Sequence, residues 1–235
     1  MAKRAGLKVA YVVLWLPEPS QTFVLDEVNT LFRLGLDVEV FTLYGPRPPR
    51  RLAGLPPVLP PVTNLGSRRA LTLLHDLAQV RARFGPEAVR FLAGVAARRW
   101  RSLETAGEAF WAMLAGVHLA GLLPQRGVSH IHASWANGPA TAAWVASRLS
   151  GIPFSFCARA HDIYPPDGAL LEKLTEAAFI RTENEANRRY LSGLCPAAGP
   201  KMEAIYNGVP LEVGETARPE PVPPFTILAL GRFVV

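Results

Sequence analysis

Apolar positions follow two different spacings at the start of the chain. Residues 9–16 are almost continuously apolar, which is typical of a strand buried on both faces of a parallel sheet. Residues 24–32 carry apolar side chains three or four positions apart, as on one face of a helix, and residues 38–43 alternate again. The order of strand, helix and strand predicts one βαβ unit, whose helix Ser20 or Thr22 can cap.

The same alternation returns in the second half of the chain. Strands are predicted at residues 128–133, 153–158, 178–182 and 201–206. Helices are predicted at residues 137–149, 169–177 and 183–191. Repeated β–α alternation predicts an α/β fold with a doubly wound, Rossmann-like parallel sheet and helices on both faces.

The segments between these two halves have other patterns. Residues 45–66 hold seven prolines and no periodic pattern, which predicts a long surface loop. Residues 67–123 have helical spacing and predict two or three helices. No stretch has 18 uninterrupted apolar residues, so we expect no membrane-spanning helix. The apolar run at residues 9–16 is too short and too close to Lys8 for a signal peptide, and we interpret it as a strand.

The last residues predict a domain boundary. Residues 209–224 combine five prolines with charged residues, which is typical of a semi-rigid linker. Residues 225–230 again form an apolar, strand-like run, followed by Gly231 and Arg232. We therefore expect one domain at residues 1–208, a linker at 209–224, and the start of a truncated second domain at 225–235.

Composition sets broad limits on the class of protein. Of 235 residues, 49% are hydrophobic and 19% are charged, so we expect a globular chain. The net charge of +6 suits an anionic partner, such as a phosphorylated sugar, a membrane surface or nucleic acid, but also an ordinary arginine-rich surface. Of the two cysteines, Cys157 ends the apolar run 153–157 and is predicted to lie in the core. Together with Cys195 it implies no disulfide framework, which a chain of this size does not need, and a reducing cytosol is the simpler expectation.

Polar residues follow the predicted strands at the edge where open α/β sheets bind ligands. They are Ser20, Gln21 and Thr22 after the first strand, then His132, Ser134, Asn137, Arg159, His161, Asp162, Glu183, Asn184 and Asn207 after the later ones. Because the carboxyl ends of parallel strands share one edge, these side chains predict a site for a polar ligand, although loops are polar in general.

Several familiar sites are missing from the sequence. There is no G-x-G-x-x-G after the first strand, no G-x-x-x-x-G-K-[ST] loop and no G-x-S-x-G elbow. His130 and His132 have the spacing of two metal ligands, but no third ligand lies at metal-site spacing, so we predict no metal. Residues 98–101, Arg-Arg-Trp-Arg, suit phospholipid headgroups, an anionic acceptor or a solvated helix face, and are too short to predict nucleic-acid binding.

Four segments carry a resemblance to a known family. They are residues 17–27 (PEPSQTFVLDE), 130–136 (HIHASWA), 152–164 (IPFSFCARAHDIY), and 187–191 with 205–209 (NRRYL, IYNGV) and the later LALGR at 228–232. Their order and spacing resemble the GT-B glycosyltransferases of family 4, within them the bacterial exopolysaccharide and colanic-acid type. The likeness spans nearly the whole chain.

The resemblance implies two Rossmann-like domains, of which this chain holds the acceptor-binding one. It implies retaining transfer of a hexose from a nucleotide sugar, such as UDP- or GDP-hexose, to a lipid-linked or polysaccharide acceptor at the cytoplasmic membrane face. Arg232 matches an arginine that holds the donor diphosphate, where fixed positive charge stabilises the leaving group. No metal or further cofactor is required.

The resemblance also assigns candidate site residues. The predicted acceptor-binding residues are Ser20, Thr22, His132, Ser134 and Asn137. The predicted catalytic residues, beside the reacting sugar, are Arg159, His161 and Asp162, and those on the donor side are Asn207 and Arg232.

Two departures from the family pattern leave alternatives open. Arg159 stands where the family usually has histidine, and arginine cannot act as a neutral base. Most of the donor site is absent from the sequence, so we expect the chain alone to be inactive. The chain or its parent could therefore be a non-catalytic binding or regulatory module of the same fold. A different Rossmann-type enzyme, such as a sugar epimerase, is disfavoured by the missing glycine fingerprint.

Overall fold

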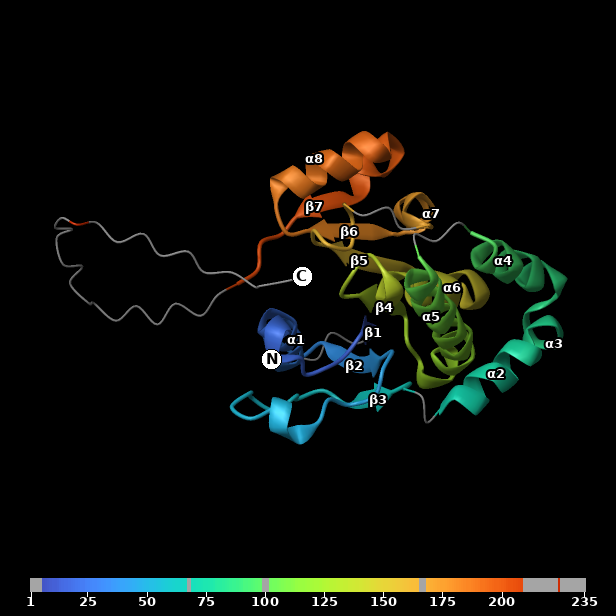
Figure 1. Cartoon of the computed structure of the whole chain (residues 1–235), viewed down its shortest axis with the longest axis horizontal. Helices are drawn as coiled ribbons and strands as arrows, with labels where there is room; N and C mark the ends of the chain where they lie inside the picture. Colours follow the sequence, from blue (N-terminus) through green and yellow to red (C-terminus); the bar gives the residue numbers. More distant parts are fainter. Residues whose placement is uncertain (1–5, 67–68, 99–101, 165–167, 209–223, 225–235) are drawn as a thin grey trace.

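The fold is a single seven-stranded parallel sheet with helices on both faces. The computed structural model describes residues 6–66, 69–98, 102–164, 168–208 and 224 (Figure 1). The strands are β1 (Lys8–Val13), β2 (Asp37–Thr42), β3 (Val62–Asn64), β4 (His130–Ala133), β5 (Phe154–Ala158), β6 (Phe179–Thr182) and β7 (Met202–Ala204). Their order in the sheet is β3-β2-β1-β4-β5-β6-β7, and every neighbouring pair is parallel. The predicted doubly wound α/β class is confirmed.

The centre of the sheet lies between β1 and β4, where the strand order reverses. Val12 of β1 pairs with Phe41 on one side and with Ala133 on the other, and all three are fully buried. Successive strands are added outward from this point in opposite directions, and the connections that follow β1 and β4 therefore leave a crevice between them at the carboxyl ends of the strands. The topology therefore places a ligand site beside the ends of β1 and β4.

Right-handed crossovers decide which face each helix covers. The helices are α1 (Thr22–Arg33), α2 (Ala70–Ala78), α3 (Val80–Phe84), α4 (Pro86–Ala96), α5 (Leu103–Leu122), α6 (Gly138–Ser150), α7 (Leu170–Glu176) and α8 (Glu185–Leu194). Helix α1 packs Val24 and Val28 against Tyr11 of β1, whereas α5 and α6 share a core with Val12 on the opposite face. Helices α2, α3 and α4 form an arc beyond α5 (Figure 1).

The closest helix packing in the fold joins α5 to α6, which lie side by side in Figure 1. Gly116 of α5 has no room for a side chain, since a Cβ there would lie 2.7 Å from the carbonyl oxygen of Ala142 and 2.7 Å from Cβ of Val145. Small side chains on α6, among them Ala142, Ala143 and Ala146, allow this approach. The large buried Trp144 then fills the space beside Phe91 of α4.

The structure corrects three local predictions. The proline-rich segment 45–66 is not entirely loop, because residues Val62–Asn64 form β3, paired with β2 from Val40 to Thr42. Three residues are too few to show alternation among prolines. The described parts of residues 67–123 hold four helices instead of two or three, because the five-residue α3 is separate from α2 and α4. The predicted cap by Ser20 or Thr22 is wrong: Gln21 is the N-cap of α1 and makes no side-chain cap bond.

The predicted linker and second-domain strand fall outside the part of the chain that is described, apart from the single residue 224. Residues 209–224 and 225–235 therefore stay predictions, as does the role of Arg232. Within the described residues, no helix is long and apolar enough to cross a bilayer, and this includes the 20-residue α5.

Exchange of Gly116 for alanine tests the α5–α6 contact. Gly116→Ala should lower the free energy of unfolding by about 1–3 kcal/mol, because the added methyl group meets backbone and Cβ atoms that cannot move aside freely. Gly107→Ala is the matched control on the same helix, since its site is exposed and open. It should stabilise the helix by about 0.5–1 kcal/mol. Urea denaturation followed by circular dichroism measures both, and equal effects would contradict the close packing.

Candidate functional site

Arg159 is the centre of the cluster at the carboxyl ends of the strands. It directly follows β5, and its side chain is 2% exposed. The guanidinium lies between two rings, with Cζ 4.5 Å from the centroid of Phe23 and 4.9 Å from that of Trp135. Its Nε donates to the carbonyl oxygen of Ser134 at 3.1 Å. Aromatic faces stabilise a guanidinium by cation–π attraction, so this charge is held from both sides.

Two carboxylates balance the Arg159 charge. Its Nη1 pairs with Glu183, just after β6, and its Nη2 lies 4.0 Å from Oε2 of Glu27 on α1. A second arginine, Arg181 of β6, also pairs with Glu27. Two guanidiniums and two carboxylates therefore offset each other in a poorly solvated region, where an unpaired charge would cost several kcal/mol.

Asn207, which follows β7, joins both ion pairs. Its Nδ2 donates to Oε1 of Glu183 at 2.7 Å, and its Oδ1 accepts from Nη2 of Arg181 at 2.9 Å and from Nη1 of Arg159 at 3.4 Å. The network thus links α1 to the ends of β5, β6 and β7. We call these five residues, Glu27, Arg159, Arg181, Glu183 and Asn207, the ion-pair cluster.

Asp162 holds the loop after β5 in place. One carboxylate oxygen accepts from the amides of Arg159 (3.0 Å) and Ala160 (2.9 Å), and the other accepts from the amide of Ala136 (2.7 Å). Burial raises the pKa of Asp162, and these amide hydrogen bonds act against the rise. The residue fixes the Arg159 backbone relative to the loop before α6, and its predicted catalytic role stays a prediction.

The loop between β4 and α6 carries two more predicted residues. Ser134 is fully buried, and Asn137 is the N-cap of α6. Among the described residues, neither Oγ of Ser134 nor Oδ1 of Asn137 has a hydrogen-bond partner. Lys173 of α7 donates to the carbonyl oxygen of Ala136, whose amide donates to Asp162. Both backbone polar groups of Ala136 are therefore hydrogen-bonded to side chains outside this loop.

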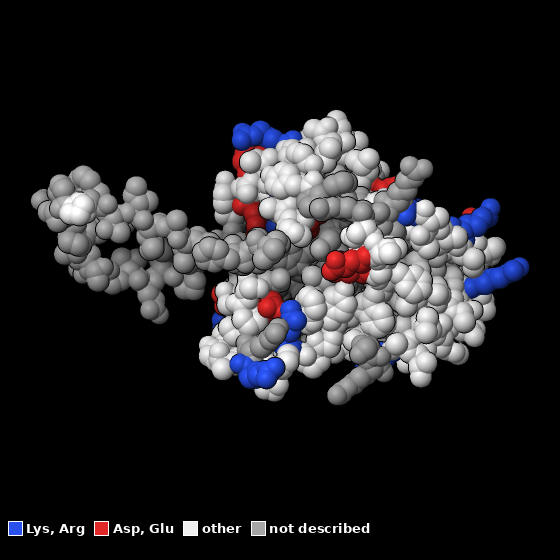
Figure 2. Space-filling view, in the orientation of Figure 1, with Lys and Arg blue, Asp and Glu red and all other residues white. Residues whose placement is uncertain are grey.

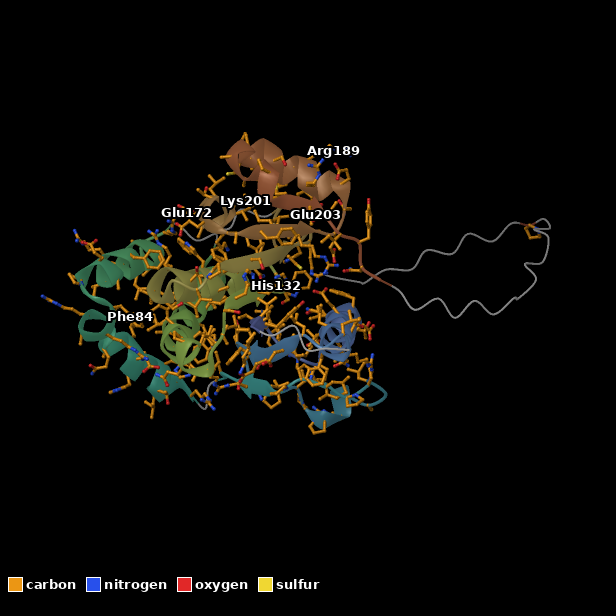
Figure 3. All side chains as sticks on the ribbon, turned by 180° about the vertical axis from the view of Figure 1, so that it is seen from behind. Phe84, His132, Glu172, Arg189, Lys201 and Glu203 are labelled. Atoms are coloured by element: carbon orange, nitrogen blue, oxygen red, sulfur yellow. The ribbon has the colours of Figure 1, made fainter. Side chains whose placement is uncertain are left out.

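His132 lies one layer deeper, near the middle of the sheet (Figure 3). Its Nδ1 shares the Ser155 hydroxyl with Nε2 of His130, at 2.8 and 2.7 Å, which confirms that both histidines face the same side of β4. Its Nε2 lies 3.5 Å from Sγ of Cys157, and its ring lies 5.1 Å from that of Tyr11. Burial lowers the pKa of His132 to about 4, so the ring is neutral at physiological pH.

Three of the predicted residues lie at the same edge but outside the ion-pair cluster. His161 is exposed and faces the start of α5, where burial and Glu104 raise the pKa of Glu108 and His161 opposes the rise. Ser20 and Thr22 are exposed at the start of α1. In the described part of the chain, neither Ser20 nor Thr22 is hydrogen-bonded to the ion-pair cluster. Ser20 Oγ instead donates to Glu18 at 3.4 Å.

A cavity of about 550 Å³ opens beside the ion-pair cluster. Its lining includes Phe23, Asp26 and Glu27 of α1 together with Arg181 and Asn207. Carboxylates, an amide and a guanidinium next to apolar surface offer both hydrogen bonds and packing, which suits a polar organic ligand. On the face shown in Figure 2, the described Lys and Arg side chains lie in separate small groups, so the basic net charge does not gather there.

Six residues of this site had no role predicted from the sequence. Phe23, Glu27 and Trp135 lie in the segments that carry the resemblance, Cys157 is predicted only as core, and Tyr11 and Arg181 are not singled out. Glu27 and Arg181 each carried a signal: Glu27 lies within the apolar stripe of α1, and Arg181 lies inside a short buried strand. A charge in either position needs a partner, although the pattern alone does not name it.

Removal of the central charge tests the balance of the cluster. Arg159→Met should lower the free energy of unfolding by about 3–5 kcal/mol, because Glu183 loses its partner and Glu27 loses one of two. Arg188→Met removes the exposed pair with Glu185 on α8 and should change stability little. Urea denaturation of both variants measures the difference. A loss for Arg159→Met no larger than the control would contradict a charge-balanced cluster.

Comparison with known proteins gives similarity of fold and no family. No protein-family model matches the sequence, and no curated protein matches it. Among solved structures, UDP-N-acetylglucosamine 2-epimerase from Rickettsia bellii aligns with a TM-score of 0.49 and 14% identity, over 83% of this chain and 43% of that chain. A glycosyltransferase from Rickettsia africae ESF-5 aligns with a TM-score of 0.49 and 11% identity, over 86% and 44%. The chain spans less than half the length of either structure.

Proposed function

We propose that this chain is the acceptor-side domain of a two-domain, nucleotide-sugar-dependent glycosyltransferase of the GT-B, family 4 type. The supporting observation is that the resembling segments, far apart in sequence, meet around Arg159. Residues 17–27 supply Phe23 and Glu27, residues 130–136 supply Trp135, and residues 205–209 supply Asn207. Chance similarity in separate loops would not require these particular side chains to touch one another.

In this proposal the chain binds the acceptor and presents its hydroxyl group to a sugar held by the second domain. The 550 Å³ cavity beside Asp26 receives the acceptor, which is lipid-linked or a polysaccharide. Because Asn207 lines this cavity, we assign it to the acceptor instead of to the donor side that the resemblance implies. Ser20, Thr22 and His161, exposed at the same edge, contact the parts of the substrates that lie above it. His132, Ser134 and Asn137 form the wall beneath, where the Ser134 carbonyl accepts a hydrogen bond from Arg159 and Asn137 is the N-cap of α6.

The chemistry of the reaction belongs to the donor side. The acceptor oxygen forms a bond to the anomeric carbon of a UDP- or GDP-hexose as the bond from that carbon to the phosphate oxygen breaks. Negative charge then grows on the nucleoside diphosphate that leaves. Arg232 would stabilise this charge together with a lysine of the second domain. Transfer proceeds with retention, and the departing phosphate takes the acceptor proton, so no metal ion is needed for the step. We place the reaction at the cytoplasmic face of the membrane.

A second candidate function is a non-catalytic binding module of the same fold. The observation in its favour is the state of Arg159, whose guanidinium is buried between two rings and paired with carboxylates. A side chain held in this way cannot act as a base or approach a sugar without breaking the ion-pair cluster. Both candidates share the acceptor site and differ in whether sugar transfer follows.

Binding of an acceptor mimic by the chain tests the first part of the proposal. A short isoprenyl diphosphate-linked hexose should bind, and Asn207→Ala should weaken it at least tenfold, because Asn207 lines the cavity. Gln125→Ala is the control, an exposed amide between α5 and β4 at the opposite edge of the sheet. Isothermal titration calorimetry measures the dissociation constants. Absence of binding, or equal effects of both exchanges, would argue against an acceptor site here.

The exchange Arg159→His distinguishes the two candidates. In a protein that carries both halves, we expect it to raise the rate of sugar transfer at least tenfold if the buried arginine has suppressed the chemistry. The physical reason is that histidine, unlike arginine, can be neutral near pH 7. Release of UDP or GDP from the matching nucleotide sugars measures the rate. An unchanged, substantial rate in both proteins would show that Arg159 is compatible with catalysis and remove the non-catalytic candidate.

A further inference from the structure

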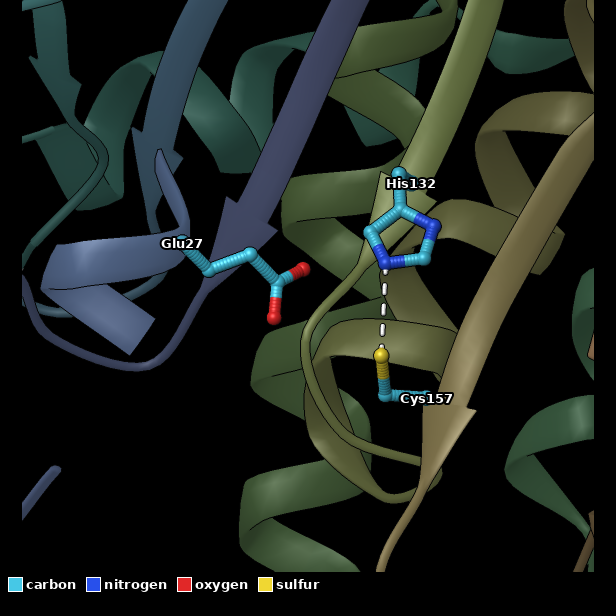
Figure 4. Close-up of side chains that lie close together, drawn as sticks. All are labelled: Glu27, His132 and Cys157. Carbon is cyan, nitrogen blue, oxygen red and sulfur yellow. Dashed lines mark hydrogen bonds between the residues drawn. The ribbon is translucent and has the colours of Figure 1, made fainter. Parts of the chain in front are cut away.

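Glu27, His132 and Cys157 come together beneath the ion-pair cluster, on the α1 face of the sheet (Figure 4). One carboxylate oxygen, one imidazole nitrogen and the Cys157 sulfur all lie within 4.8 Å of one another. They come from α1, β4 and β5, so neither a local motif nor sequence spacing joins them. From the geometry and chemistry of this triad we propose a binding site for one zinc-type divalent cation, next to the proposed acceptor cavity, with which it shares Glu27.

The distances suit a tetrahedral ion. Zinc bonds nitrogen at about 2.0–2.1 Å and sulfur at about 2.3 Å, so the two ligand atoms of a tetrahedral site are about 3.5 Å apart. Nε2 of His132 and Sγ of Cys157 are separated by 3.5 Å. The third ligand, from Glu27, lies within 4.8 Å of both and reaches bonding distance through a side-chain shift of about 1 Å. A fourth position is left for water.

The surrounding contacts orient the ligands as a metal site requires. The Ser155 hydroxyl, 2.8 Å from Nδ1 of His132, fixes the ring so that Nε2 faces Cys157. The Tyr11 hydroxyl donates to Oε1 of Glu27 at 2.9 Å. Hydrogen bonds of this kind to the remote atoms of ligands are a regular part of metal sites. The donor set of nitrogen, sulfur and oxygen favours zinc or cobalt over magnesium or calcium, which take oxygen ligands.

A surface groove gives a cation access to the triad, and the nearby arginine limits how tightly the cation can bind. A groove of about 210 Å³, lined in part by Tyr11, Glu27 and His132, reaches two of the three ligands, and Cys157 lies buried behind them. Coordination replaces the Cys157 thiol proton, which leaves to solvent, by a metal–sulfur bond. Arg181 contacts Glu27 and lies 3.9 Å from Sγ of Cys157. Its charge stabilises the thiolate but repels the cation, so the site is weaker than one formed by four cysteines.

Bound there, the ion would join α1 to the two central strands β4 and β5. The ion-pair cluster lies directly above, since Glu27 belongs to both groups. The cation would therefore stiffen the wall of the cavity beside α1 instead of taking part in sugar transfer. This proposal stands apart from the proposed function, because it predicts metal binding in the presence or absence of any sugar.

Cobalt titration of the purified chain tests the site. Co²⁺ should bind with one equivalent per chain and give a near-ultraviolet sulfur-to-cobalt charge-transfer band, which Zn²⁺ then displaces. Cys157→Ser should remove the band and weaken binding at least tenfold, whereas Cys195→Ser, at the end of α8, should leave both unchanged. His132→Gln should weaken binding at least tenfold, and the exposed His75→Gln should not.

Fold loss is separated from ligand loss by a second measurement. Zn²⁺ should raise the melting temperature of the chain, and EDTA should reverse the rise. Glu27→Gln keeps the sulfur and nitrogen ligands, so it should retain the charge-transfer band while weakening binding at least tenfold. Absence of the band in the folded wild-type chain, or its loss in Cys195→Ser with retention in Cys157→Ser, would overturn the proposal.

Discussion

The buried charge of Arg159 is the constraint on which the rest of the site depends. A guanidinium with 2% of its side chain exposed must have carboxylate partners and acceptors close by, because desolvation of an unpaired charge costs several kcal/mol. Glu183 and Glu27 supply the charge, Ser134 supplies a carbonyl, and Phe23 and Trp135 supply ring faces. The loops at the ends of β4, β5 and β6 and helix α1 therefore cannot move independently.

Parallel sheet topology makes this convergence possible. All seven strands run the same way, so the residues that follow each strand meet at one edge. The crossovers leave α1 on the face opposite α5 and α6. Polar side chains of β4 and β6 on the α1 side, among them His130, His132 and Arg181, then line a groove instead of a packed core. The ion-pair cluster, the cavity beside it and the proposed cation site are three consequences of this uneven covering.

The sequence separation of the residues that interact explains which predictions from the sequence succeeded and which failed. The strands at residues 9–16 and 153–158 were predicted correctly because a strand buried on both faces has a nearly continuous apolar sequence. Strand β3 was missed because three residues among prolines carry no period. The start of α1 was misassigned because a Ser or Thr near a helix start permits a cap without forming one. His132 was placed on the correct face of β4, but its partner Cys157 was interpreted only as core.

The sequence by itself determined the α/β class, the parallel sheet and the edge that carries the polar residues. These follow from local periodicity, which needs no knowledge of distant contacts. Only the tertiary structure decided that Arg159 is enclosed by two rings and two carboxylates, that Asp162 holds the Ala136 amide, and that Glu27 lies beside His132 and Cys157. Those pairings join residues more than twenty positions apart, and the energy of a buried charge or ligand set depends on which partners the fold delivers, which no local pattern encodes.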